Sequence, residues 1–247
     1  MTIASNADNF ADTDVPGSRH EINRFWWLYL PVGFFCLRYA VHMFTDRGAG
    51  LESYFLGELG VVENLTVFIL LVALWVTIDT LRRVGGEAPS LKLFLVFYAL
   101  GCIYFAGEEA SWGQHWFGWS TNEFFQAIND QQETNFHNTS KWLDRMPKAV
   151  VSLAIFVGGV VLPIYFRVKS RRIDYSWRAW WLIPTMVCLP TAVIATVATW
   201  PSKIERQIDF NFYFNQAQEM KELYVAFFIL LFIVSLKRRL VANSRSQ

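Results

Sequence analysis

The sequence predicts an all-α fold, a polytopic membrane bundle of about six transmembrane helices. Two observations predict it. The 247 residues are 53% hydrophobic and only 17% charged, with 22 Phe and 11 Trp, whereas soluble domains average about 25% charged residues. Apolar runs also recur along the chain at lengths close to the roughly 20 residues that cross a bilayer as a helix. This composition excludes a disordered chain, a disulfide scaffold and a nucleic-acid-binding protein with a basic face.

Six segments are predicted to span the membrane within a single bundle domain at 25–240. The third and sixth are short as apolar runs, and polar residues beside each are expected to extend the helix. Residues 1–24 are polar without the apolar core of a signal peptide, so we expect a flexible cytoplasmic segment there and a cytoplasmic tail at 241–247. The predicted spans are Phe25–Phe44, Val61–Leu81, Leu91–Gly107, Ala149–Phe166, Ala179–Trp200 and Leu223–Leu236.

Lysine and arginine are distributed unequally between alternate loops. The N-terminal segment, the second and fourth loops and the tail hold 14 of the 22, and the opposite loops hold 7. Because cytoplasmic loops are enriched in these residues, both termini are predicted to be cytoplasmic, as six crossings require. The expected location is a bacterial inner membrane. The acidic residues show the opposite distribution, since 14 of the 21 lie on or near the external side.

One stretch of the chain carries acids without nearby cations. From Leu93 to Ser140 there is no Lys or Arg in 48 residues, but there are five acids and two histidines. A buried carboxylate is protonated, paired or bound to metal. Glu108 and Glu109 directly follow the third apolar run and therefore need such compensation. The external loop at 108–147 is where the sequence predicts a functional site.

The local structure of this loop follows from spacing. If the third helix continued beyond the acids, Glu108, Trp112 and His115 would share one helical face. A break is expected before Thr121, which is predicted to cap a short helix over Asn122–Ile128. That helix is expected to lie in the membrane interface between the third and fourth spans.

Carboxylates and imidazoles in the loop predict a metal centre. On a helix, Glu133 and His137 would fall at i and i+4 and hold one ion between them, and such ligand sets suit iron, manganese or zinc. Neighbouring amides would orient the ligands by hydrogen bonds. The alternative is a solvated, turn-rich loop without a metal. The predicted ligands are Glu108, Glu109, Glu133, His137 and Glu219, and the residues predicted to orient them are Asn129, Asn135, Asn138 and Arg38.

Three residues are predicted to be catalytic, namely Glu109, His115 and Glu222. Glu219 and Glu222 share one helical face at the external start of the last span, where they are expected to converge with the acids of the third span. The alternative is that they simply favour the start of a helix, because acids there interact well with its dipole.

Two charged residues inside the spans need partners, because an intramembrane charge is costly. For Arg38, in the first span, the expected partner is Glu63 or Glu108, and the pair would fix helix packing. For Asp79, near the cytoplasmic end of the second span, the expected partner is one of the two arginines that follow it closely.

The stretch GEEASWGQ at 107–114 is followed by Phe117-Gly118 and by N-x-Q-x-E-x-N-x-H-N at 129–138. This pattern resembles the signature of a group of uncharacterised bacterial multi-pass membrane proteins. The resemblance covers 32 contiguous residues, together with Glu63 and the acids before the last span. It implies that these polar residues act as one unit, and it implies no activity.

Three functions are compatible with the sequence. The first is a metal-dependent enzyme at the external interface that acts on a lipid or lipid-linked substrate. The second is a non-catalytic subunit of a larger membrane complex, in which the polar cluster is structural. The third is a cation or proton transporter, against which we see no internal repeat and no helix broken near the midplane. The expected partners are the lipid bilayer, a lipid-like substrate and a membrane-protein partner, without nucleic acid.

Overall fold

The structure is a computed structural model, and all regular structure in the part of the chain it describes is helical. This confirms the predicted all-α class. Four of the described helical segments are long and apolar enough to cross a membrane, at Val61–Arg83, Pro89–Glu109, Arg145–Val168 and Trp180–Val197. The N-terminal segment up to residue 21 lies outside the description. The described residues are 22–44, 60–84, 88–128, 134–135, 139, 141–169, 173, 179–201, 203–204 and 217–244.

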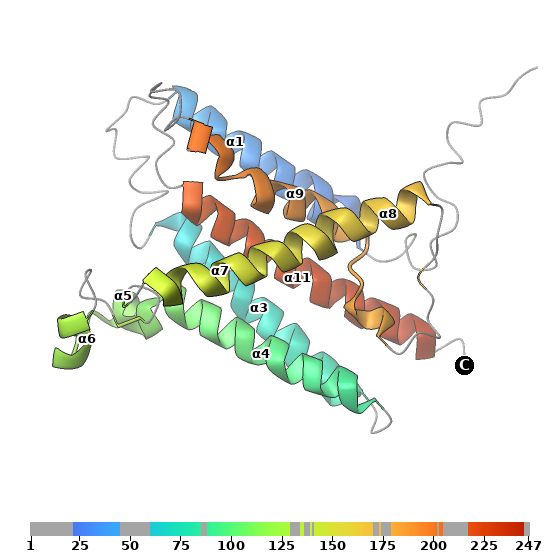
Figure 1. Cartoon of the computed structure of the whole chain (residues 1–247), viewed down its shortest axis with the longest axis horizontal. Coiled ribbons are helices and arrows are strands. Elements are labelled where there is room, and N and C mark those ends of the chain that lie inside the picture. The colour runs from blue at the N-terminus through green and yellow to red at the C-terminus, as the bar shows by residue number, and fades with distance from the viewer. Residues whose placement is uncertain are drawn as a thin grey trace, which may run out of the picture.

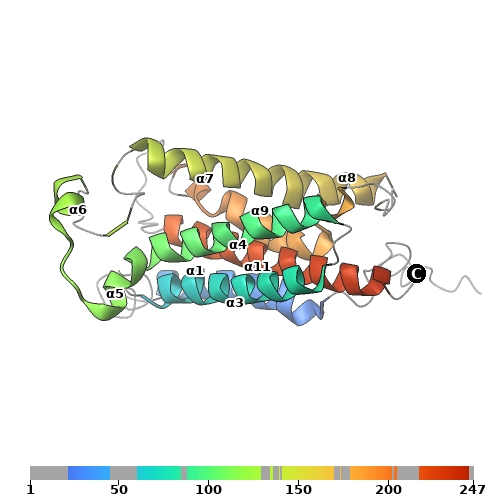
Figure 2. The ribbon, with the colours of Figure 1, turned by 90° about the horizontal axis from the view of Figure 1, so that it is seen from below.

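Helix packing is most extensive among three helices. Helix α3 (Val61–Arg83) packs against α4 (Pro89–Glu109) on one side and against α11 (Ala217–Ser244) on another. The long helices run lengthwise between two ends of the molecule (Figures 1 and 2). The short helices α5 (Gln114–Phe117) and α6 (Glu123–Ile128) lie together at one end, and the C-terminal end of α11 lies at the other.

The first and fourth predicted spans each contain a wider, π-helical turn. In both, this turn precedes a proline, Pro31 or Pro163. Proline has no N–H for the carbonyl four residues earlier, and a π turn or kink accommodates that loss. The first span is formed by η1 (Phe25–Tyr29) and α1 (Leu30–Phe44), and the fourth by α7 (Lys141–Ile155), η4 (Phe156–Val161) and α8 (Leu162–Val168).

The fifth predicted span, Ala179–Trp200, is not one continuous α-helix. Two 3-10 turns, η5 (Trp180–Leu182) and η6 (Met186–Cys188), precede α9 (Leu189–Val197), with non-helical backbone between the turns. Pro184 lies in that interruption, and proline disfavours helix in the residue before it. The sequence predicts no helix broken near the midplane, and this interruption lies close to the start of the segment rather than at its middle.

The interruption lies toward the end of the bundle that carries the C-terminus. The hydroxyl oxygens of Thr185 and Ser235 are 3.3 Å apart, and Ser235 is near the close of the apolar run of α11. The opposite end of the bundle carries Glu109, so the broken backbone and the acids are far apart along the helices.

The third and sixth predicted spans are extended by polar residues, as expected. Helix α4 continues through Glu108 to Glu109, and α11 covers 28 residues around the predicted run Leu223–Leu236. Buried residues of α11 contact the rest of the bundle throughout its length. Its Tyr224 donates a hydrogen bond to the carbonyl of Pro31, and Tyr98 of α4 donates one to the carbonyl of Ile229.

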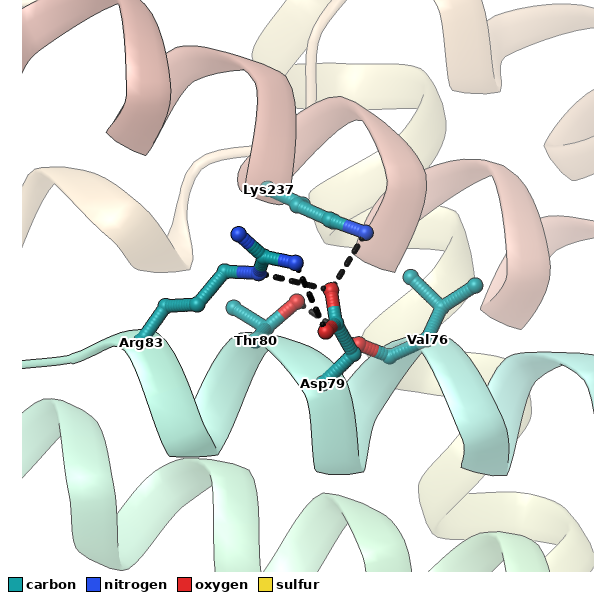
Figure 3. A network of polar contacts seen from close by, with 5 residues as sticks. All are labelled: Val76, Asp79, Thr80, Arg83 and Lys237. Atoms are coloured by element: carbon teal, nitrogen blue, oxygen red, sulfur yellow. Dashed lines mark hydrogen bonds and ion pairs between the residues drawn. The ribbon is translucent and has the colours of Figure 1, made fainter.

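An ion-pair network joins α3 to α11 near the end that carries the C-terminus (Figure 3). The carboxylate of Asp79 accepts hydrogen bonds of 2.9 and 3.0 Å from Arg83, one turn later on α3. Its Oδ2 atom also lies 2.6 Å from Nζ of Lys237 on α11. The predicted pairing of Asp79 with a following arginine is confirmed, and Lys237 adds a link between helices.

Candidate functional site

The backbone turns sharply where the third span ends. Three consecutive residues after α4 have positive φ angles, 43° at Ser111, 54° at Trp112 and 100° at Gly113. This left-handed region is unfavourable for residues with a Cβ atom. The helix therefore does not continue from Glu109 through residue 117, and the predicted common face of Glu108, Trp112 and His115 does not form.

The turn brings Trp112 back against α4. Its Nε1 atom donates a hydrogen bond of 2.8 Å to Oε1 of Glu108, whose residue is only 4% exposed. A Cβ atom at Gly107 would lie 2.9 Å from the Trp112 ring, closer than packing permits. Gly107, Glu108 and Trp112 thus form one packed unit. In this unit the tryptophan N–H compensates part of the negative charge of the carboxylate.

Polar residues of the motif hold the loop after the turn. The buried side chain of Asn135 donates a hydrogen bond of 3.2 Å to the hydroxyl of Ser111. The side-chain amide of Gln114 donates a hydrogen bond of 2.8 Å to the hydroxyl of Thr121. Its amide oxygen accepts a hydrogen bond of 2.7 Å from the backbone N–H of Thr134. The expectation that these residues act as one unit is supported here by hydrogen bonds that define a loop.

The short helix α6 begins one residue later than predicted. The Oδ1 atom of Asn122 accepts a hydrogen bond of 3.0 Å from the N–H of Phe125, so Asn122 is its cap. The predicted cap, Thr121, is buried and contacts Gln114 instead. Another bond of 2.9 Å, from Trp116 to Asn64, attaches the loop to α3.

A cavity of about 430 Å³ lies between α4, α7 and α11. Its walls are aromatic and aliphatic toward the middle of the bundle, where Phe94, Phe97 and Ile229 contribute. Toward the end that carries α5 and α6, the lining residues include polar and charged ones, although the surface that faces the cavity stays almost entirely apolar. The polar lining residues there are Glu108, Glu109, Lys148, Ser152, Gln218, Lys221 and Glu222.

Charges from three helices meet at this polar end. Nζ of Lys148 on α7 lies 3.1 Å from Oε1 of Glu222 on α11. The side-chain amide of Gln218 donates a hydrogen bond of 2.7 Å to the same oxygen. The carboxylate of Glu109 is close enough to interact electrostatically with both Lys148 and Glu222. Burial lowers the pKa of Lys221, which precedes the apolar run of α11. The predicted convergence of Glu109 with Glu222 is therefore present.

Glu63 and Glu219 also belong to this group, because each interacts electrostatically with Glu109. Three carboxylates from α3 and α11 therefore lie near Glu109, together with Lys148, and Lys221 interacts with Glu222 and Lys148. Such an arrangement is unfavourable unless protons or cations compensate the repulsion.

No protein-family model, curated protein or solved structure matches this chain. The resemblance of the motif at 107–138 rests on its residues alone.

The structure describes some of the predicted metal ligands and leaves the others outside its description. Within the described part of the chain, no cluster of three or more His, Cys, Asp or Glu side chains is placed to hold a metal ion. Glu109 and Glu219 are near one another, and Glu108 binds Trp112. The remaining predicted site residues, Glu133, His137, Asn129 and Asn138, and the side chain of His115, lie outside the description.

Arg38 was predicted to pair with Glu63 or Glu108, and that pairing stays a prediction. Its guanidinium carbon lies 5.7 Å from the ring centroid of Tyr39, a cation–π distance. Asn135 was predicted to orient metal ligands, and that role stays a prediction; its amide donates a hydrogen bond to the hydroxyl of Ser111.

Sequence reasoning did not assign Lys148, Gln218 or Lys221 to the site. A signal for all three was present, since each lies near the external end of a predicted span, the same end as Glu109. From the sequence, Lys221 is a neighbour that could neutralise Glu219 or Glu222, and Lys148 counts among the external cations. Helical spacing also places Gln218 one turn before Glu222, where the structure has their hydrogen bond.

Proposed function

We propose that the chain is a membrane-embedded enzyme that acts on a lipid or lipid-linked substrate. The observation that carries this proposal is the cavity between α4, α7 and α11, whose surface is almost entirely apolar and whose lining residues at one end include charged ones. Sites for small ligands usually measure about 300–1,000 Å³ and combine apolar walls with a few polar groups. A lipid has the same division into a hydrocarbon chain and a polar head.

The substrate would reach this cavity from the bilayer. Phe97 and Tyr104 line the cavity and are 64% and 40% exposed, on a helix of which most of the apolar surface faces outward. The hydrocarbon part would then lie between α4 and α7, with its head against Glu109 and Glu222.

In this proposal Glu109 and Glu222 transfer protons at the substrate head. Carboxyl groups that repel one another hold their protons with unequal affinity, so that one donates while another accepts. Lys148 keeps Glu222 in place through their 3.1 Å contact. His115, whose side chain is not described, remains a proposed third member of this catalytic group.

A divalent metal ion, iron, manganese or zinc, remains a separate proposal. Its support is the carboxylate-rich donor set of Glu109 and Glu219, to which Glu133 and His137 would be added. Such an ion would act as a Lewis acid on the substrate head. Metal analysis of the purified chain is expected to find one stoichiometric transition metal that is lost in His137→Ala. A chain without stoichiometric metal would remove this part of the proposal.

The proposed location is a bacterial inner membrane, with six crossings, both termini in the cytoplasm, α6 in the external interface and the acids at that face. Support comes from the enrichment of lysine and arginine in the N-terminal segment, the second and fourth loops and the tail. It also comes from α5 and α6 lying at the end opposite the C-terminus (Figure 1).

The function is tested with the reconstituted chain and a total lipid extract of its host membrane, analysed by mass spectrometry before and after incubation. Wild-type protein is expected to convert one lipid species. Glu109→Gln is expected to abolish conversion, and Gly101→Leu to block it by filling the cavity, since a Cβ atom at Gly101 meets open space. Gly33→Leu is the matched control, because Gly33 is equally open and lies outside the cavity. Conversion by Gly101→Leu at the wild-type rate would refute the proposal.

A second candidate is a non-catalytic subunit of a membrane complex. The observation in its favour is the exposed surface of α4 and of the α7–α8 segment, whose apolar windows are only 22% and 17% buried. A partner helix fits such a surface as well as lipid does. Stable co-purification of a partner, with full cellular function in Glu109→Gln, would favour this candidate over the enzyme.

A further inference from the structure

Several polar side chains line the cavity, yet the surface that faces the cavity is almost entirely apolar. The reason is that their polar atoms contact other groups of the protein. The hydroxyl of Tyr98 donates a hydrogen bond to the carbonyl of Ile229. The hydroxyl of Ser152 donates one to the carbonyl of Lys148, one turn earlier on α7. Both hydroxyl protons are thereby used within the protein.

The charged lining residues have partners as well. Oε1 of Glu222 accepts a hydrogen bond of 2.7 Å from Gln218 and lies 3.1 Å from Nζ of Lys148. Oε1 of Glu108 accepts a hydrogen bond of 2.8 Å from Trp112. These contacts join lining residues to one another or to the turn after α4. The charge of each of these two carboxylates is therefore compensated in part by the protein, without a ligand.

Glu109 and Lys221 complete the charged lining residues, and each lies near an opposite charge. Glu109 interacts electrostatically with Lys148, as well as with neighbouring carboxylates. Lys221 interacts with Glu222. A ligand with a charged head would have to compete with these contacts, and it would lose its own hydration in a cavity with apolar walls. Removing an ion from water without a new partner costs free energy.

From this arrangement we propose that the cavity takes a lipid whose head is uncharged and carries hydroxyl or carbonyl oxygens. The inference rests on the proposed function, because it specifies the substrate class of the same cavity. The oxygen-bearing head would lie at the end with Glu109, and the hydrocarbon chain would extend toward Phe94. Diacylglycerols and polyprenols are membrane lipids with this chemistry.

The exposed part of the cavity wall favours the same class of ligand. Phe97 lines the cavity and is 64% exposed. It lies about 18 Å along α4 from Glu109, at about 1.5 Å per residue. At that depth from the end of the span, a bilayer is hydrocarbon. A lipid that enters beside Phe97 carries its head through an apolar environment, and an uncharged head does so at a smaller cost than an ion.

The test is native mass spectrometry of the full chain, equilibrated with equal amounts of four lipids. Diacylglycerol, phosphatidylethanolamine and phosphatidylglycerol carry identical acyl chains, and a polyprenol of similar length is the fourth. Wild-type protein is expected to retain one or both uncharged lipids with about tenfold preference over each phospholipid. The retained species distinguishes an acyl chain from a prenyl chain. Equal or greater retention of a phospholipid would overturn the inference.

Two variants of α7 test the cause of the preference. Val150 and Val151 are exposed neighbours on this helix, and Val151 lines the cavity whereas Val150 does not. Val151→Lys adds a further cation to the cavity wall, so it is expected to raise the retention of phosphatidylglycerol relative to diacylglycerol about fivefold. Val150→Lys is the matched control and should keep the wild-type profile. The same lipid profile in both variants would contradict the inference.

Two controls separate the failure of this inference from the failure of the proposed function. Gly101→Leu should lose every bound lipid, because Gly101 lines the cavity and a Cβ atom there meets open space, whereas Gly33→Leu should bind as wild type. Equal retention of all four lipids by wild type, with loss in Gly101→Leu, would overturn the head-group inference and leave the lipid cavity intact. No retention by wild type, or equal retention by wild type and Gly101→Leu, would overturn both. Thermal unfolding of each variant in detergent verifies that it is folded.

Discussion

The Nζ atom of Lys148 lies 3.1 Å from the Oε1 atom of Glu222, and this contact joins α7 to α11 at the charged end of the cavity. The two side chains are 32% and 13% exposed, so water screens their attraction only partly. The pair joins α7 to α11 beside the cavity, and it compensates the charge of one carboxylate near Glu109.

Replacing Lys148 by Met is expected to loosen α7 and to lower the free energy of unfolding by about 1 kcal/mol, near the upper range for accessible ion pairs. Thermal unfolding in detergent measures the change. Arg145→Met is the control, because Arg145 is exposed on the same helix. An equal loss in both variants would show that the contact with Glu222 adds nothing.

The packing of Trp112 on Gly107 yields a second prediction. Gly107→Ala places a Cβ atom 2.9 Å from the indole, and such overpacking typically costs about 1–3 kcal/mol. The indole should move away from Glu108, with a change in tryptophan fluorescence and a lower unfolding temperature. Gly101→Ala, on the same helix with open space around it, is expected to be neutral or slightly stabilising.

Two adjacent glycines in η4 differ in their surroundings. A Cβ atom at Gly159 would lie 2.5 Å from the Phe228 ring and 2.6 Å from the Cβ atom of Ala192, whereas one at Gly158 would lie 3.5 Å from Pro184. Gly159→Ala is therefore expected to destabilise the fold by about 1–3 kcal/mol. Gly158→Ala should have little effect. Equal unfolding temperatures for the two variants would contradict the close approach of η4 to α11.

The network around Asp79 predicts a loss of stability at the other end of the bundle. Asp79→Asn removes the charge that both Arg83 and Lys237 contact, so α3 and α11 should separate more easily there. We expect a lower unfolding temperature in detergent, and the difference should shrink at high salt because the contacts are accessible to water. Arg82→Gln, at an exposed position beside the network, should leave the temperature unchanged.

The proposed orientation is tested with single cysteines in a chain whose Cys36, Cys102 and Cys188 are replaced by serine. A cysteine in place of Glu123 on α6 should react with a membrane-impermeant thiol reagent in intact cells. A cysteine in place of Arg82 should react only after the membrane is opened. The reverse pattern would show that the acids face the cytoplasm.

Hydrophobicity was sufficient to predict most of the fold. The apolar runs located α3 and α4 within two residues at each end, because length and composition decide whether a helix crosses a bilayer. Helix α11 extends six residues before and eight residues after its predicted run. The apolar runs could not locate the interruption near Pro184, since an apolar run looks the same whether its backbone is helical or extended. Pro163 shows why proline alone does not settle the matter, because there a preceding π turn preserves the helical segment.

The site was predicted in part. Charge counting indicated that Glu109 and Glu222 meet at one end of the bundle, because both flank spans on the same side. It did not indicate that Glu108 contacts Trp112. That contact depends on left-handed backbone at Ser111 and Trp112, which neither residue type favours.

The left-handed turn has a mechanical consequence for the cavity. Hydrogen bonds from Trp112 to Glu108 and from Trp116 to Asn64 fasten the outer loop to α4 and α3, which pack closely on each other. One wall of the cavity is thereby braced. The facing wall, α7, is joined to α11 through the contact of Lys148 with Glu222. Shifting α4 would disturb its packing on α3 as well as these hydrogen bonds, whereas displacing α7 from α11 would break the ion pair of Lys148 with Glu222.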